Sequence, residues 1–222
     1  MRYYPIFLDM KNKNCLVVGG GPVGIRKALA LEKCGAHVKV ISEKFSEGAD
    51  GVKGTSILLA EKKYEKKDIK GMFLVFAATN NTDLNQKIKK DAAESHILCN
   101  VADAPDNSDF LVPSTVDRGD LIIAVSTSGA SPAMAKRIRQ DLEGLFDPAY
   151  AGVLRLMANI RKKLLSAGHA PDEHRQAFSS LIDRGILDLI RAGDAITINL
   201  ILHEIFGKGY AYQELISSGR DE

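Results

Sequence analysis

The chain has 222 residues, which is enough for one large or two small domains. Its 45% apolar and 26% charged residues are typical of a globular protein with a packed core. The net charge of +2 gives no reason to expect nucleic acid as a partner, and we expect no membrane span and no signal peptide. Three widely spaced cysteines, Cys15, Cys34 and Cys99, indicate a reducing compartment rather than a disulfide framework or a zinc site.

The first half of the chain alternates between strand and helix patterns. Strands are expected at 15–18, 37–41, 56–59, 72–77 and 96–101, and helices at 22–34 and 82–94. Gly35 is expected to end the first helix. Such alternation predicts an α/β fold with a Rossmann-like parallel sheet, which we place at residues 1–113.

The pattern changes after residue 103. Two apolar runs joined by Asp117-Arg118-Gly119-Asp120 predict a β-hairpin, and Ser131 with Pro132 predicts the start of a helix. One face of that helix should carry the apolar residues Ala135, Ile138, Leu142 and Leu145. We assign 114–148 to a hairpin and helix segment and 149–222 to a C-terminal helical domain. Its apolar stripes are expected at Val153, Met157, Ile160 and Leu164, at Phe178, Leu181, Ile182, Ile186 and Leu189, and, in a helix capped by Asp194, at Ile198, Ile201, Leu202 and Ile205.

A glycine cluster follows the first expected strand. The spacing Gly19-x-Gly21-x-x-Gly24 between a strand and a helix is the dinucleotide-binding pattern. The first glycine permits a tight turn, the second lets the backbone approach a pyrophosphate, and the third lets helix and strand pack closely. Together with Pro22 and Val23, these residues are the predicted phosphate site of a dinucleotide cofactor, at a helix N-terminus.

The ends of two further strands should complete the cofactor site. Ser42 and Glu43 follow the second strand, and Glu43 lies near the position of an acid that binds a ribose hydroxyl in NAD enzymes. The adjoining Lys44 leaves the choice between NAD and NADP open. Small and polar residues at the end of the fourth strand, Ala78, Thr79 and Asn80, should line the crevice.

The sequence suggests two places for chemistry on a substrate. Asp103 follows the fifth strand and should face the crevice, where a carboxylate could take a proton or meet a metal, and Asn100 at the same strand end is expected to contact substrate. The loop of Ser126, Thr127, Ser128 and Gly129 precedes a helix N-terminus and could hold an anion, with Lys136, Arg137 and Arg139 following on that helix. Otherwise these residues cap a loop or form a solvated basic face.

An ordered set of segments resembles a known family. The segments are Tyr4-Pro5-Ile6-Phe7-Leu8-Asp9, CLVVGGGPVGIRK, Asn100-Val101-Ala102-Asp103, Phe110-Leu111-Val112-Pro113-Ser114 and Ser126-Thr127-Ser128-Gly129-Ala130-Ser131-Pro132. They are similar to the siroheme synthase N-terminal module, whose members are precorrin-2 dehydrogenases and, in some cases, sirohydrochlorin ferrochelatases. The likeness runs from Tyr4 to about Leu145.

The resemblance implies NAD-dependent oxidation of precorrin-2 to sirohydrochlorin by a cytoplasmic homodimer, assembled through the segment that follows the nucleotide domain. It places the family's catalytic aspartate at Asp103 and an active-site serine at Ser126. The substrate would bear eight carboxylates, for which the Ser126–Ser131 loop, Lys136 and Arg139 are the candidate ligands. Iron insertion, with Asp103 as the base or the Fe²⁺ ligand, stays open, because no second metal-ligating group is evident.

Two other functions remain as alternatives. One is an NAD-sensing regulatory module without catalysis, for which a basic recognition helix would be the sign, and the C-terminal helices carry mixed charge instead. The other is an NAD-dependent dehydrogenase of a small acid. Such an enzyme would need a histidine or arginine near the crevice, and the sequence shows no clear candidate.

Overall fold

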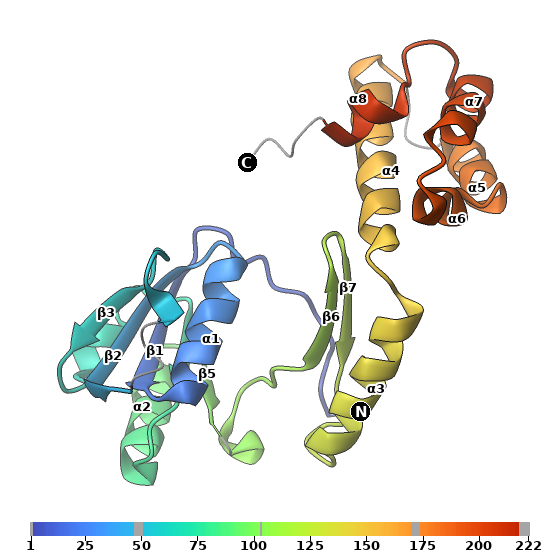
Figure 1. The fold of residues 1–222 in the computed structure, drawn as a ribbon. Coiled ribbons are helices and arrows are strands. Elements are labelled where there is room, and N and C mark those ends of the chain that lie inside the picture. The colour runs from blue at the N-terminus through green and yellow to red at the C-terminus, as the bar shows by residue number, and fades with distance from the viewer. Residues whose placement is uncertain (1, 47–50, 103, 170–173, 218–222) are drawn as a thin grey trace. The chain divides into compact units, whose positions relative to one another are not determined.

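The computed structural model describes residues 2–46, 51–102, 104–169 and 174–217. The chain folds as two compact units, an N-terminal unit of residues 1–112 and a C-terminal unit of residues 113–222 (Figure 1). This boundary lies one residue from the predicted end of the nucleotide domain. The further division predicted at residue 149 falls within the C-terminal unit and stays a prediction.

The N-terminal unit is a five-stranded parallel sheet with the strand order β3-β2-β1-β4-β5. Its strands are β1 (Asn14–Gly20), β2 (His37–Phe45), β3 (Leu58–Glu61), β4 (Leu74–Ala77) and β5 (Leu98–Val101), and its α-helices are α1 (Pro22–Lys33) and α2 (Thr82–Glu94). A short 3₁₀ helix, η2 (Lys66–Ile69), precedes β4, and another, η3 (Pro105–Asn107), follows β5. This is the predicted Rossmann-like architecture.

The central strands are apolar on both faces because a helix covers each face of the sheet. Cys15 and Val17 of β1 face the core that contains Ile25 and Ala28 of α1. Leu16 and Val18, which alternate with them, face the opposite core, which contains Ile88 and Ala92 of α2. The continuous apolar run after residue 14 is therefore the pattern of a buried central strand.

The boundaries of four strands, β2 to β5, differ clearly from the predictions. β2 continues to Phe45 instead of ending at Ile41, because Lys39 to Ser42 pair with β3 and Phe45 pairs with Gly20 of β1. β3 lies at Leu58–Glu61 rather than 56–59, and β4 and β5 each begin two residues later than expected. Ser42 and Glu43 consequently belong to β2 itself rather than to a loop after it.

The C-terminal unit combines a hairpin with six helices among its described residues. These are β6 (Ser114–Arg118), β7 (Leu121–Val125), α3 (Pro132–Leu145), α4 (Ala149–Ser166), α5 (Arg175–Asp183), α6 (Ile186–Ala192), α7 (Ala195–Phe206) and α8 (Tyr212–Ser217). The predicted hairpin is confirmed, with a turn at Gly119 and Asp120, since Asp117 and Arg118 still pair with β7. Ser131 caps α3 by accepting a hydrogen bond from the Met134 N–H at 3.2 Å.

Helices α4 to α8 enclose a core of their own. The predicted stripes on α4 and α7 are inside it, and Asp194 caps α7 through the Thr197 N–H at 3.0 Å. The stripe from Phe178 to Leu189 is split, because Gly185 takes a left-handed conformation between α5 and α6. The split leaves Ile182 60% exposed, so its predicted place in the core is wrong. Within the described ranges no helix has the length and apolar character to cross a bilayer.

Candidate functional site

The glycine turn after β1 has three positions with different steric surroundings. Gly19 has φ +124°, and a side chain there would overlap the carbonyl of Ala78. A side chain on Gly24 would overlap the carbonyl oxygen of Gly19, so α1 lies directly against β1. Around Gly21 a side chain would meet nothing within 4 Å. The turn therefore leaves open space at the one glycine that a pyrophosphate must approach.

The start of α1 faces that space without a competing group. Gly21 is the N-cap residue and has no side chain to bond the first backbone N–H groups, and Pro22 occupies the first turn. The first turn contains no acidic residue. Unpaired N–H groups and the positive end of the helix dipole therefore fit a phosphate group at this position.

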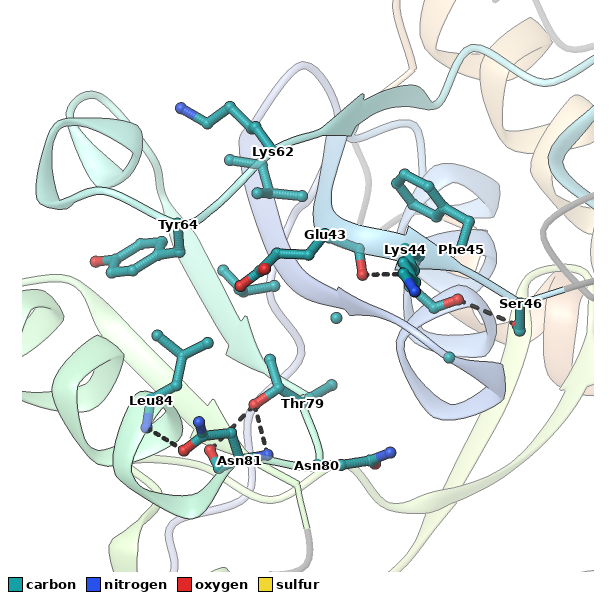
Figure 2. Close-up of a pocket in the computed structure, with 17 residues that line it drawn as sticks. Glu43, Lys44, Phe45, Ser46, Lys62, Tyr64, Thr79, Asn80, Asn81 and Leu84 are labelled. Atoms are coloured by element: carbon teal, nitrogen blue, oxygen red, sulfur yellow. Dashed lines mark hydrogen bonds between the residues drawn. The ribbon is translucent and has the colours of Figure 1, made fainter.

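A pocket of about 660 Å³ opens where β1, β2 and β4 end (Figure 2). Seven of the predicted cofactor residues line it: Gly19, Gly21, Ser42, Glu43, Ala78, Thr79 and Asn80. The predicted residues Pro22, Val23 and Gly24 do not line it and instead form the first turns of α1. Parallel strands end together at one edge of a sheet, so segments far apart in sequence meet here, at the topological switch point between β1 and β4.

The turn after β4 is fixed by two asparagines that the sequence analysis did not single out. The Thr79 hydroxyl donates to Asn85 Oδ1 at 2.7 Å, and Asn85 Nδ2 donates to the Thr79 carbonyl at 3.0 Å. Asn81 caps α2 by accepting from the Leu84 N–H at 3.0 Å (Figure 2). A polar residue on the buried face of α2 was the available signal for Asn85, which is 6% exposed.

The pocket is also lined by residues that sequence reasoning missed. They are Phe45, Ser46, Lys62, Tyr64 and Leu84, and Lys44, which the sequence analysis noted beside Glu43, lines it as well. Figure 2 shows the Glu43 carboxylate directed into the pocket, on the side where Tyr64 lies. Burial raises the pKa of Tyr64 far above its usual value, and its hydroxyl donates to Asp91 at 3.1 Å. Tyr64 therefore offers a neutral wall, and Glu43 places a negative charge at the pocket.

The two cysteines in strands are inert, as predicted. Cys15 and Cys99 are fully buried, whereas Cys34 is exposed. Burial raises the pKa of both buried thiols to about 11. Neither thiol forms the thiolate needed for nucleophilic or metal chemistry at neutral pH.

The end of β5 carries the residues predicted to face the substrate. Asp103 lies outside the described residues. Its neighbour Ala102 donates its N–H to the Ala77 carbonyl at 2.8 Å, beside the end of β4. Asn100 is only 6% exposed, and protein groups bind its amide on both sides: Lys27 donates to Oδ1 at 3.1 Å and Nδ2 donates to the Phe110 carbonyl at 2.9 Å.

The predicted anion-binding loop belongs to the C-terminal unit. The Ser126 hydroxyl accepts from the Ser128 N–H at 3.1 Å, and Ser128 and Gly129 both have positive φ. The Thr127 hydroxyl donates to the Ser131 carbonyl and accepts from the Ser131 N–H, both at 3.1 Å. The loop is thus ordered by its own side chains, and its role as a substrate contact stays a prediction.

The basic residues of α3 have different surroundings. Arg139 pairs with Glu143 one turn later, and Arg137 pairs with Asp141 at 3.0 Å. Lys136 is exposed. No group of three or more histidine, cysteine or acidic side chains occurs among the described residues in a geometry suited to a metal ion.

Family models match two consecutive parts of the chain. Residues 6–114 match a family described as putative NAD(P)-binding, and residues 118–145 match the sirohaem biosynthesis protein central domain. The first match covers the sheet and the pocket, and the second covers most of the hairpin and α3.

Two similar proteins, both described as siroheme synthases, agree with both family models. A siroheme synthase of Nitrosococcus oceani is 38% identical over 197 residues, covering 87% of this chain and 42% of that protein. A siroheme synthase of Photobacterium profundum is 34% identical over 194 residues, covering 87% of this chain and 41% of that protein. The chain thus spans about two fifths of the length of these relatives.

A solved structure, described as SirC, precorrin-2 dehydrogenase, is 26% identical and superimposes with a TM-score of 0.72. The match covers 91% of this chain and 98% of that one, so the likeness extends through the C-terminal helices. The dinucleotide pocket, the central segment and these relatives agree: over about nine tenths of its length this chain is similar to siroheme synthases and to a precorrin-2 dehydrogenase.

Proposed function

We propose that this chain oxidises precorrin-2 to sirohydrochlorin with NAD⁺ as the acceptor. The observation that supports it most is the presence, in one chain, of an NAD(P)-type pocket and a siroheme-biosynthesis segment directly after it. The solved relative of almost the same length bears the name of this activity.

The residues of the pocket fit two parts of the cofactor, its pyrophosphate and a ribose. The open space at Gly21 and the unpaired N–H groups of α1 suit the pyrophosphate, and Glu43 suits a ribose hydroxyl. When bound, NAD⁺ supplies the acceptor for a hydride from the macrocycle. The oxidation also releases one proton, so a base is needed beside the reacting carbon.

We assign the role of proton acceptor to Asp103. It follows Ala102 in sequence, directly after the carboxyl end of β5, where ligands of open α/β sheets bind. A carboxylate there accepts the proton or orients the ring. The carboxylates of the substrate would be bound by backbone N–H groups of the Ser126–Gly129 loop and by Lys136 and Arg139 of α3.

We further propose a homodimer formed through α3, working in the cytoplasm. Met134, Ile138 and Leu145 lie on one face of α3 and are 54%, 38% and 66% exposed, whereas Ala135 is buried. Exposed apolar residues in one stripe are typical of a surface that another chain covers. Three free cysteines support a reducing compartment.

Anaerobic absorbance spectroscopy with enzymatically made precorrin-2 tests this function. The sirohydrochlorin spectrum is expected only when NAD⁺ is present. Asp103→Asn should lower kcat by about 100-fold or more, the usual size of general acid–base contributions. Asp106→Asn is the matched control, because that side chain is 90% exposed and pairs with Arg2 on the surface; its kcat should stay within about twofold of wild type.

Addition of Fe²⁺ or Co²⁺ to the product then tests for iron insertion. A metal-dependent spectral shift faster than the rate without enzyme would add chelatase activity to this chain. NAD⁺ binding without any oxidation of precorrin-2 would refute the proposal and favour a regulatory module.

A further inference from the structure

Lys27 of α1 reaches across the sheet to a buried amide on β5. Val17, Phe76 and Asn100 are register partners on β1, β4 and β5, so their side chains form a row on the face that α1 covers. The Lys27 ammonium lies 4.9 Å from the centre of the Phe76 ring and donates to Asn100 Oδ1 at 3.1 Å. Lys27 therefore links the helix that starts at the glycine turn to the strand that precedes Asp103.

Asn100 occupies a strand position that would otherwise carry an apolar side chain. Its neighbours Cys99 and Val101 face the opposite core, and Asn100 itself is 6% exposed. A buried amide is stable only when its oxygen and nitrogen both have partners. Lys27 satisfies the oxygen, which directs the nitrogen toward the Phe110 carbonyl at 2.9 Å.

The Asn100 amide makes one of three contacts that hold residues 108–110 against β5. Ser108 accepts from the Val101 N–H at 2.9 Å and donates to the Ala104 carbonyl at 3.1 Å. Asp109 accepts from the Cys99 N–H at 2.9 Å and pairs with Lys89. The Phe110 ring packs edge-on against Phe76 at 5.4 Å. The loop that starts beside Asp103 is thus anchored at 108, 109 and 110.

We propose that Lys27 is a positioning residue for the reaction, acting through Asn100 on the loop that contains Asp103. This inference rests on the proposed function, and it gives Asn100 a structural connection rather than the substrate contact expected from the sequence. Lys27 lies one turn after Gly24, where α1 is fixed against β1. The cofactor-binding helix and the loop with the proposed base are therefore connected through two side chains.

The decisive variant is Lys27→Met, which keeps an unbranched stem over Phe76 and removes the ammonium donor. Its kcat for precorrin-2 oxidation should fall about 30-fold, because small displacements of a catalytic group cost up to about 100-fold. The KM for NAD⁺ should change less than about threefold, since the pocket residues are untouched. Lys27→Arg restores a donor and should recover most of kcat.

The matched control is Lys13→Met. Lys13 also lies over a phenylalanine, 5.3 Å from the Phe73 ring, but it precedes β1 and so lies at the opposite end of the sheet from the pocket. Its removal should leave kcat and KM unchanged. Asn100→Ser should reproduce the loss seen in Lys27→Met, and the double variant should lose little more, because the two residues act as one unit.

Hydrogen exchange of the backbone provides a readout independent of activity. In Lys27→Met the Val101 and Cys99 amides, which bond Ser108 and Asp109, should exchange faster, whereas amides at the glycine turn should not. An unchanged kcat, a raised KM for NAD⁺ alone, or no recovery in Lys27→Arg would overturn the proposal. If wild-type protein does not oxidise precorrin-2, the proposed function fails, and unaltered exchange in Lys27→Met would separately refute the link to the loop.

Discussion

Gly24 of α1 lies directly against Gly19 of β1, with no room for a side chain between them. The contact is between backbones, so a neighbouring side chain cannot move to relieve it. It brings the N-terminus of α1 to the edge of the sheet where the pocket opens. Gly24 is therefore needed for packing, whereas Gly21, three residues earlier, borders open space in front of the helix. Substitution of each glycine can distinguish the two roles.

Gly24→Ala should destabilise the N-terminal unit. The added methyl group overlaps the Gly19 carbonyl, and overpacking of this kind costs about 3 kcal/mol. Thermal unfolding followed by circular dichroism should show Tm lowered by about 10 °C. A variant with wild-type Tm would contradict the close packing of α1 on β1.

Gly21→Ala should instead weaken cofactor binding with little effect on stability. The new methyl group would occupy open space, so the fold has no reason to change. That space is where the pyrophosphate must approach the backbone, and the Kd for NAD⁺ should rise about tenfold or more, equal to about 1.4 kcal/mol. Fluorescence titration with NAD⁺ measures it, and unaltered affinity would place the phosphates elsewhere.

Glu43 should select NAD⁺ over NADP⁺. Its carboxylate points into the pocket, where the additional phosphate of NADP⁺ would add a second negative charge. Glu43→Ser should reduce the preference for NAD⁺, measured as the ratio of the two kcat/KM values, by about 30-fold, equal to about 2 kcal/mol of repulsion. A wild-type enzyme that prefers NADP⁺ would make Lys44 the determining residue.

Asp68 should make the stability of the N-terminal unit decrease at acidic pH. Burial acts to raise the pKa of Asp68, but Lys62 at 2.9 Å and the Glu65 N–H at 3.0 Å outweigh it and hold the pKa below the ordinary 3.8. The stabilisation is therefore complete above about pH 4 and is lost as pH falls through the lower folded-state pKa.

Asp68→Asn should lower the free energy of unfolding by about 2 kcal/mol at pH 7 and reduce its decline in acid, as measured by urea titration. Glu94→Gln is the control, because Glu94 and Lys66 form an exposed pair, and its effect should be much smaller than that of Asp68→Asn. Equal effects of the two variants would contradict the role of burial at Asp68.

Leu145→Glu should convert the proposed dimer to a monomer. A charge buried in an apolar interface is left without a partner. Light scattering after gel filtration should give a wild-type mass of twice the 24.1 kDa chain, and the single-chain mass for Leu145→Glu. Leu200→Glu is the matched control, since Leu200 of α7 is equally exposed at 66% and should leave the mass unchanged. A wild-type monomer would refute the assembly.

The local signals in the sequence predicted the elements of the N-terminal unit well. The run Cys15 to Val18, the glycine spacing and the helical period after Pro22 are determined by neighbours a few residues apart, and β1 and α1 follow them. The buried state of Cys15 and Cys99 follows for the same reason. Strand ends were less predictable, because β2 extends beyond Ile41 through pairing of Ser42 with β3 and of Phe45 with Gly20 of β1, which are both distant in sequence.

The family's ordered motifs were visible in the sequence, as were the residues at the ends of β1, β2 and β4, because each follows a recognisable strand. Tertiary structure alone decided which residues share the pocket wall, since Tyr64 and Lys62 come from a segment without a motif. It also decided that Asn100 is buried under Lys27, because hydrogen bonding across a sheet joins residues 73 positions apart. Local sequence specifies turns and periods, and packing determines which polar groups become partners.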